Sequence, residues 1–106
     1  MAARTAQRAV TGDVARRNVV HPPPDTPEQV WATSVNVRAT PSTSARIVTV
    51  IPAPTTVYVK CQKHAESVAY GGITNDAWSC LPQQQGWISN IFLKGPAWMP
   101  GVPECP

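Results

Sequence analysis

Three cysteines and two histidines supply the groups in this sequence that could bind a metal or act as a nucleophile. Cys61 and His64 are separated by two residues, a spacing that suits a pair of zinc ligands. Cys80 and Cys105 could complete a site of three thiolates and one imidazole, but their distances along the chain match no zinc pattern. An odd number of cysteines also allows at most one disulfide within the chain. We therefore expect no metal site and no other cofactor, because a disulfide uses the same sulfur atoms more simply.

A thiol near a histidine could also support nucleophilic catalysis. However, His21 lies among prolines, and no acid in the sequence is convincingly placed to orient His64. The chain contains no G-x-S-x-G, no phosphate-binding glycine loop and no H-E-x-x-H zinc motif. Glu66 and Asp76 fall on segments expected to be loops, where solvated carboxylates are the simpler interpretation. We therefore predict that the protein is not an enzyme.

The fold that positions these groups must be small. A length of 106 residues suits one small domain with extensions. Hydrophobic residues make up 42%, which is enough for a small core. The longest apolar segment, residues 47–59, is broken by Pro52 and Pro54, so we expect no span of the roughly 20 residues that a bilayer needs. Residues 1–20 lack the apolar stretch of a secretory signal, so none is expected.

The positive charge of the chain is concentrated in residues 1–20, an expected N-terminal arm. This arm has four arginines and one acid, whereas residues 21–106 have five basic and five acidic residues. We expect the arm to dock onto a protein assembly and to become helical only against that partner. The expected docking residues are Arg4, Arg8, Arg16 and Arg17. Nucleic acid is not expected as a partner, because the remainder of the chain is neutral and has no basic face.

A proline-rich linker is expected over residues 21–30, followed by a folded body over 31–94 and a proline-rich tail over 95–106 that carries Cys105. Three adjacent prolines, Pro22–Pro24, favour the polyproline II conformation and disfavour helix and central strand. Pro24 and Pro27 form a P-x-x-P pair that could dock in an aromatic groove. A stiff spacer is the simpler interpretation.

Alternating and β-branched runs predict that the body is all-β. The expected strands are Val35–Arg38, Ile47–Ile51, Val57–Cys61, Trp78–Leu81 and Trp87–Leu93. Turn residues separate them at 41–44, 52–54, 71–72, 75–76 and 83–86. Short strands at a spacing of about ten residues indicate a sandwich or a barrel. A body of roughly 65 residues is too small for a sandwich, so we predict a small barrel.

The order of these segments resembles the bacterial SH3 (SH3b) domain family over roughly residues 33–94 and the tail. The matching segments are V-N-V-R at Val35–Arg38, P-S-T-S at Pro41–Ser44, the apolar strand Ile47–Ile51, the proline turn Pro52–Thr55, V-Y-V at Val57–Val59, D-A-W-S at Asp76–Ser79 and G-W-I-S-N at Gly86–Asn90. The ending P-G-V-P-E-C at Pro100–Cys105 is similar to that of secreted actinobacterial members. The sequence departs from the family at Thr40, where glycine is frequent, and in the length of residues 62–75.

The resemblance implies a five-stranded SH3-like barrel that binds bacterial cell-wall peptide or another ligand and has no catalytic activity. In the family, the loop after the first strand and nearby aromatic side chains form the ligand groove. Carried over to this chain, the ligand-binding residues are Asn36, Arg38, Thr40, Tyr58, Trp78 and Trp87. Trp87 has an alternative role in core packing, because so small a barrel needs large side chains.

Strand alternation and the same resemblance bear on the pairing of the cysteines. Alternation places Cys61 on the inward face with Val57 and Val59 and turns Cys80 outward, which disfavours a bond between these two cysteines. Cys105 lies on a flexible tail and could reach either. A Cys61–Cys105 disulfide is the first choice and agrees with the cysteine of the family ending. Three reduced, buried thiols remain the alternative.

Two functions remain open for a barrel of this kind. The first is an assembly module, whose arm docks onto a larger particle such as a phage virion while the barrel stays exposed for surface or cell-wall contact. The second is a free secreted module that binds peptidoglycan peptide. The expected location is extracellular or on a virion surface. The two functions differ in one requirement, because only the assembly module needs residues 1–30.

Overall fold

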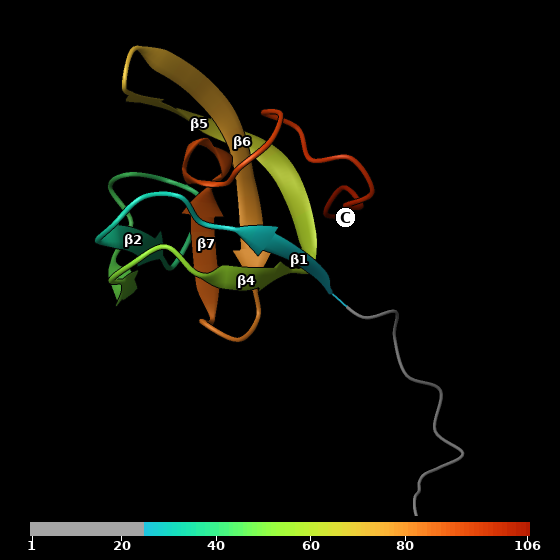
Figure 1. The fold of residues 1–106 in the computed structure, drawn as a ribbon, viewed down its shortest axis with the longest axis horizontal. Helices are drawn as coiled ribbons and strands as arrows, with labels where there is room; N and C mark the ends of the chain where they lie inside the picture. The colour runs from blue at the N-terminus through green and yellow to red at the C-terminus, as the bar shows by residue number, and fades with distance from the viewer. Residues whose placement is uncertain (1–24) are drawn as a thin grey trace, which may run out of the picture.

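The computed structural model describes residues 25–106, which form seven β-strands and one 3-10 turn (Figure 1). The elements are β1 (Thr26–Gln29), β2 (Val35–Arg38), β3 (Ile47–Ile51), β4 (Thr56–Val59), β5 (Cys61–Tyr70), β6 (Ile73–Leu81), β7 (Gly86–Ser89) and the turn η1 (Asn90–Phe92). The prediction of an all-β fold is confirmed. Among residues 25–106, no helix is long and apolar enough to cross a membrane. The arm, with its four arginines, lies outside the described residues.

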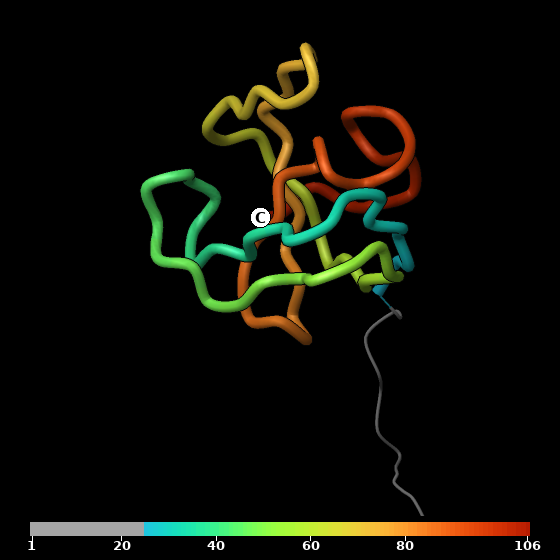
Figure 2. The backbone as a smooth tube through the Cα atoms, turned by 60° about the vertical axis from the view of Figure 1, so that its left-hand side comes forward, coloured from blue at the N-terminus to red at the C-terminus, as the bar shows by residue number. Residues whose placement is uncertain are grey.

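Five strands form one antiparallel sheet in the order β3-β2-β7-β6-β5, and β1 pairs with β4 in a second, two-stranded sheet. The β1–β4 pair runs across β6 and β7, so the two sheets make two layers of a small barrel-like body (Figure 1). The loop between β2 and β3 and the β5–β6 hairpin project from this body (Figure 2). These two projections border the candidate site described below.

The predicted linker over residues 21–30 ends earlier than expected, because Thr26–Gln29 form β1. Pro27 is tolerated in this strand since β1 pairs with β4 alone among the described strands, and an edge strand leaves one side of its backbone free. Immediately after β1, Val30 is fully buried. Trp31 then donates its backbone N–H to the backbone oxygen of Phe92 at 3.1 Å, which joins the segment after β1 to η1.

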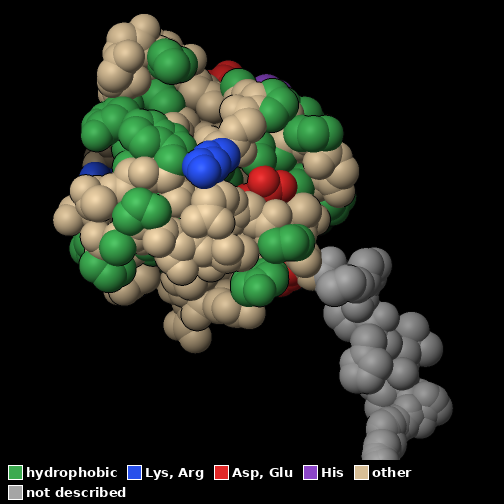
Figure 3. Space-filling view, viewed as in Figure 1, with side chains coloured by type: hydrophobic (Ala, Val, Ile, Leu, Met, Phe, Trp, Pro, Cys, Tyr) green, Lys and Arg blue, Asp and Glu red, His purple; other side chains and the backbone are tan. Residues whose placement is uncertain are grey.

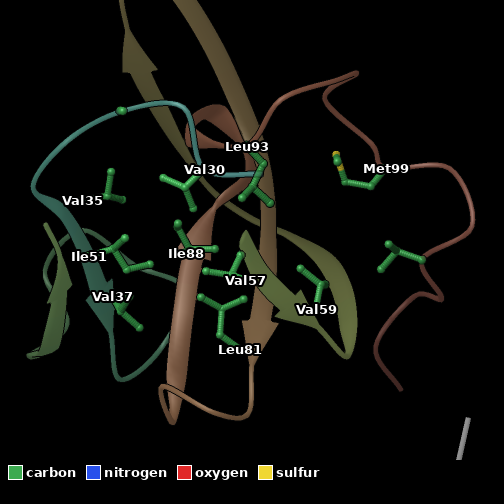
Figure 4. Packing of buried hydrophobic residues seen from close by; sticks show 12 residues of the cluster. Val30, Val35, Val37, Ile51, Val57, Val59, Leu81, Ile88, Leu93 and Met99 are labelled. Atoms are coloured by element: carbon green, nitrogen blue, oxygen red, sulfur yellow. The ribbon is translucent and has the colours of Figure 1, made fainter. Parts of the chain in front are cut away.

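The core lies between the two sheets and is built mainly from aliphatic side chains (Figure 4). In β2, alternation turns Val35 and Val37 inward and leaves Asn36 and Arg38 on the other face. The core residues are Val30, Ala32, Val35, Val37, Ile51, Val57, Val59, Leu81, Ile88, Leu93, Met99 and Val102. This set contains no tryptophan, so Trp87 does not take the alternative core role. Trp78 is also buried, but it lies outside this cluster, and Phe92 packs against the cluster.

The β5–β6 hairpin turns at Gly71 and Gly72, as predicted. Their φ angles of 60° and 80° fall in the left-handed region, which glycine occupies without a steric penalty. The turn expected at residues 75–76 is wrong, because both residues lie within β6. Asn75 instead accepts a hydrogen bond from the backbone N–H of Ala77 at 2.9 Å through its side-chain oxygen. A local side-chain contact of this kind is common in turns, and here it occurs inside a strand.

The strand expected over Val57–Cys61 is interrupted at Lys60, where β4 ends and β5 begins. Cys61 is nevertheless buried, as predicted. It lies directly opposite Cys80 in the β5–β6 register, so the two side chains project from the same face of the sheet. The prediction that these cysteines face opposite ways is therefore wrong.

The C-terminal tail is part of the folded body. The predicted disulfide is present between Cys61 and Cys105, whose Cα atoms are 4.9 Å apart. Gln62 donates its backbone N–H to Pro103 at 2.9 Å and accepts one from Cys105 at 2.8 Å, so the tail runs beside the free edge of β5. Met99 and Val102, which precede this contact, are buried in the core.

Candidate ligand-binding site

A cavity of about 190 Å³ opens beside β2, where Asn36 and Arg38 project away from the core valines. The facing wall is the β5–β6 hairpin, which contributes Val68, Tyr70 and Trp78. Three of the six residues predicted to bind a ligand, Asn36, Arg38 and Trp78, therefore line one cavity. Polar groups from β2 and apolar groups from the hairpin meet there, which is the composition of a site for an amphipathic ligand.

Arg38 is the only charged side chain among the residues that line this cavity. One guanidinium nitrogen donates a hydrogen bond to the backbone oxygen of Ala45 at 3.0 Å, which fixes the side chain under the β2–β3 loop. A guanidinium has five N–H donors, so most of them stay available to a ligand. The site is therefore suited to a ligand that carries a carboxylate or several carbonyl oxygens.

Trp78 forms the buried part of the hairpin wall. Its side chain is only 2% exposed, and its indole N–H donates to the backbone oxygen of Glu66 at 2.8 Å. This bond crosses the irregular part of the β5–β6 pairing, where the register shifts between His64 and Val68. Trp78 therefore fixes the shape of the hairpin and presents one part of its ring to the cavity.

A row of three aromatic rings continues from the cavity along the surface. Tyr70 is 47% exposed, and its ring centroid lies 5.1 Å from that of Phe92 and 5.6 Å from that of Trp31. The Trp31 indole donates to the backbone oxygen of Ile91 at 3.0 Å, which holds that ring against η1. Beyond Trp31 lies a second cavity of about 340 Å³, which is mainly apolar and includes the exposed Ile73. Hydrophobic side chains gather on this face next to the β5–β6 hairpin (Figure 3).

Glu66 connects the two walls of the first cavity. Its carboxylate accepts hydrogen bonds from the Ser42 hydroxyl at 2.9 Å, from the Thr43 backbone N–H at 2.8 Å and from the Thr43 hydroxyl. The side-chain and backbone bonds from Thr43 and the bond from Ser42 lower the pKa of the Glu66 carboxyl, and the positive charge of Arg38 adds to this effect. The β2–β3 loop is thus held against the hairpin by one carboxylate.

The other predicted ligand-binding residues lie away from this cavity. Thr40 lies at the start of the β2–β3 loop and does not line the cavity. It is not one of the two non-glycine residues with positive φ in the described part of the chain, which are Ser34 and Gln85. Tyr58 lies on β4, in the other layer, and is 40% exposed. Trp87 is partly exposed on β7, with the Lys63 ammonium nitrogen 5.9 Å from its ring centroid. The fold does not bring these three residues together with Asn36 and Arg38.

Tyr70, Phe92 and Glu66 are site residues that the sequence analysis did not identify. Phe92 lies near the end of the expected strand Trp87–Leu93, of which the first part forms β7 as predicted and Asn90–Phe92 form η1 instead. Tyr70 and Glu66 fall in the segment 62–75, whose unusual length relative to the SH3b pattern was the one available signal. Length alone could not predict that this segment folds back over β2.

His64 does have an acid to orient it, contrary to the expectation. Its Nδ1 atom lies 2.8 Å from a carboxylate oxygen of Asp76, and its ring stacks on Trp98 with the centroids 4.4 Å apart. Both polar side chains are about half exposed. Cys61 and Cys105 are engaged in the disulfide, and the described residues contain no cluster of three or more side chains that could hold a metal ion. The imidazole is thus part of a surface contact between the hairpin and the tail.

No family model, curated protein or solved structure matches this chain. The resemblance to SH3b domains therefore stays a prediction from the residues quoted above.

Proposed function

We propose that the protein is a non-catalytic, SH3b-like binding module that holds its ligand between β2 and the β5–β6 hairpin. The observation that carries this proposal is the joint lining of one cavity by Asn36, Arg38 and Trp78, with Tyr70 at its rim. Arg38 supplies hydrogen-bond donors, while the aromatic rings supply a flat apolar surface. An extended peptide that offers carbonyl or carboxylate oxygens fits both requirements, and bacterial cell-wall peptide is the ligand that the family resemblance implies.

In this proposal, the arm over residues 1–20 docks onto a larger protein assembly, such as a phage virion, and leaves the barrel exposed. The concentration of positive charge in the arm supports this part. The disulfide is compatible with an extracellular or virion-surface location, because such bonds persist in oxidising surroundings. The alternative is a free secreted module that uses the same cavity for peptidoglycan peptide.

Co-sedimentation of the full chain with purified cell-wall sacculi tests the ligand. Tyr70 and Tyr58 form a matched pair, because both are exposed but only Tyr70 lines the cavity. We expect Tyr70→Ser to raise the Kd for sacculi about tenfold and Tyr58→Ser to leave it unchanged, since losing one aromatic contact costs on the order of 1.4 kcal/mol. Equal loss in both variants, or no pelleting of the wild type, would rule out this cavity as a wall-binding site.

A full-length variant with all four arm arginines changed to glutamine distinguishes the assembly module from the free secreted module. A free wall binder keeps its pelleted fraction in this variant. An assembly module also binds sacculi through the barrel but loses co-purification with its particle. A variant that fails to pellet would instead show that the arm contributes wall affinity, which contradicts both forms of the proposal.

A further inference from the structure

Cys80 lies next to the disulfide but is not part of it. It is the free cysteine of the described chain and is partly buried on β6. The β5–β6 register places it directly opposite Cys61, which is bonded to Cys105. The fold thus brings all three cysteines to one location, although they are far apart in the sequence.

Cys61 occupies the central position of this group. Residues directly opposite each other in an antiparallel pair have Cα atoms about 4.5 to 5.5 Å apart, which lies within the range of 4.4 to 6.8 Å that a disulfide spans. Cys105 lies on the other side of β5, where the tail bonds to Gln62. Cys80 and Cys105 are therefore separated by two strand spacings, roughly 9.5 Å, which is too far for a disulfide without backbone movement.

We propose that Cys61 is a shared partner of two alternative disulfides, one with Cys105 and one with Cys80. In the exchange, the thiolate of Cys80 attacks the sulfur of Cys61 and forms a new S–S bond. The bond between Cys61 and Cys105 breaks, and Cys105 leaves as a thiolate that takes up the proton lost by Cys80. One disulfide and one thiol are present before and after, so the step needs no oxidant or reductant.

The exchange leaves the fold intact and moves the thiol from the sheet to the C-terminal tail. Met99 and Val102 stay buried and the Gln62 side chain still bonds to both of their backbone oxygens, so the tail up to this point remains anchored. The new thiol is on Cys105, which is half-buried like Cys80 but lies on the tail, beside the outer edge of the sheet. There it could form a second, intermolecular disulfide by exchange with a partner that carries an accessible disulfide.

The surroundings of Cys80 determine how the exchange depends on pH. Burial raises the pKa of the Cys80 thiol; the negative charge of Asp25 acts in the same direction and the positive charge of Lys60 opposes it. On its other side Cys80 faces Trp87 of β7, whose ring lies beneath the Lys63 ammonium. Since the thiolate is scarce near neutral pH, the exchange is slow there and becomes faster in alkaline solution.

Peptide mapping can test this proposal because trypsin separates the three cysteines. Cleavage after Lys60, Lys63 and Lys94 places Cys61, Cys80 and Cys105 in three different peptides. The full-length variant Cys105→Ala is incubated in a glutathione redox buffer, quenched in acid, blocked with N-ethylmaleimide and digested. We expect the peptides of Cys61 and Cys80 to be joined by a disulfide. Blocked or glutathione-bound cysteines at both positions would overturn the proposal.

The matched control is Cys61→Ala, which keeps Cys80 and Cys105 but removes the central partner. We expect no disulfide between them, because their separation is too large. A bond formed as readily in this control as in Cys105→Ala would mean that chain flexibility, not the sheet register, determines the pairing, which would also overturn the proposal.

The wild-type chain provides a measurement that does not depend on a variant folding. The protein is incubated at alkaline pH, quenched in acid and blocked. We expect a measurable fraction of the blocked thiol on Cys105, matched by an equal decrease of blocked thiol on Cys80. The variant Cys80→Ala should show no blocked thiol on Cys105. If the wild type is blocked on Cys80 alone at every time, or if Cys80→Ala also releases Cys105, internal exchange does not occur.

Discussion

Gln62 is a single residue on which the position of the whole tail depends. Its side chain is fully buried, and its amide nitrogen donates to the backbone oxygens of Met99 and Val102 at 2.8 and 3.0 Å. Its amide oxygen accepts from the Met99 backbone N–H at 2.9 Å and from the Asn90 side chain at 3.1 Å. Both N–H donors and both acceptor lone pairs of this amide are therefore matched inside the core, as burial requires.

Replacing Gln62 with leucine keeps the size of the side chain and leaves these backbone groups without partners. Each buried, unsatisfied group costs about 1–3 kcal/mol, so we expect Gln62→Leu to lower the free energy of unfolding by about 3–5 kcal/mol. Urea denaturation measures this difference. Gln84→Leu is the matched control, because the Gln84 side-chain oxygen is buried without a partner and loses no bond on substitution. Similar losses in both variants would contradict the role given to Gln62.

Gly86 is required for close packing between β7 and β2. A Cβ atom at this position would lie 2.7 Å from the backbone oxygen of Arg38 and equally close to side-chain carbons of Val37 and Val48. The backbone oxygen cannot move aside as a flexible side chain can. We expect Gly86→Ala to lower the free energy of unfolding by about 1–3 kcal/mol, the usual effect of an overpacked site. An unchanged midpoint of thermal unfolding would show that the strands separate easily here.

At the scale of elements, the contact between the β2–β3 loop and the β5–β6 hairpin depends on the ionised form of Glu66. Its carboxylate only accepts hydrogen bonds, from Thr43 and from Ser42, and these bonds hold its pKa below the ordinary value of 4.5. A lowered pKa in the folded state means that this group contributes stability above pH 4.5, and that the contribution is lost as the pH falls through the lower, folded-state pKa.

We therefore expect Glu66→Gln to be less stable than the wild type at neutral pH and to approach it in acid. The glutamine amide keeps one acceptor oxygen but cannot accept the full set of bonds, and it has no charge to attract Arg38. Chemical denaturation over a range of pH measures both proteins. A gap that stays constant as the pH falls below 4.5 would show that the ionised carboxylate is not the cause.

The elements differ in how well the sequence predicts them. The alternation in Val35–Arg38 and the β-branched run Ile47–Ile51 predict β2 and β3 correctly, because local pattern and burial agree there. β1 is missed because Pro27 and the preceding prolines favour an extended spacer locally, whereas pairing with β4 is a contact distant in sequence. The relative orientation of Cys61 and Cys80 is wrong for a related reason, since the register that places them opposite each other is set between two strands and not by local alternation.

The candidate site is only half predictable for the same physical reason. Asn36 and Arg38 follow from strand alternation in β2, and they line the cavity. The opposite wall depends on how far the β5–β6 hairpin folds over β2, which is determined by Glu66 and by the irregular register between His64 and Val68. Neither feature has a periodic signature, so Tyr70 could not be assigned to the site from the sequence.

At the scale of the whole molecule, a small two-layer core is closed by a disulfide between residues 44 positions apart. Closing a loop of this length restricts the unfolded chain and contributes about 4 kcal/mol, which is a large share of the stability of so small a domain. We expect reduction of the wild type to lower its free energy of unfolding by about that amount in urea titrations. The double variant Cys61→Ala/Cys105→Ala should be insensitive to reductant, and equal sensitivity in both proteins would assign the effect elsewhere.

The position of Cys61 between two possible partners gives the single variants different stabilities. Cys61→Ala removes every disulfide that the sheet permits, whereas Cys105→Ala leaves Cys61 opposite Cys80 and able to close a shorter loop. Since loop entropy depends only on the logarithm of length, the shorter closure still contributes about 3 kcal/mol. Under oxidising conditions, Cys105→Ala should therefore be more stable than Cys61→Ala by about 3 kcal/mol, and the difference should disappear on reduction. Equal stability of the two variants under both conditions would mean that the fold derives its covalent stabilisation from the tail alone.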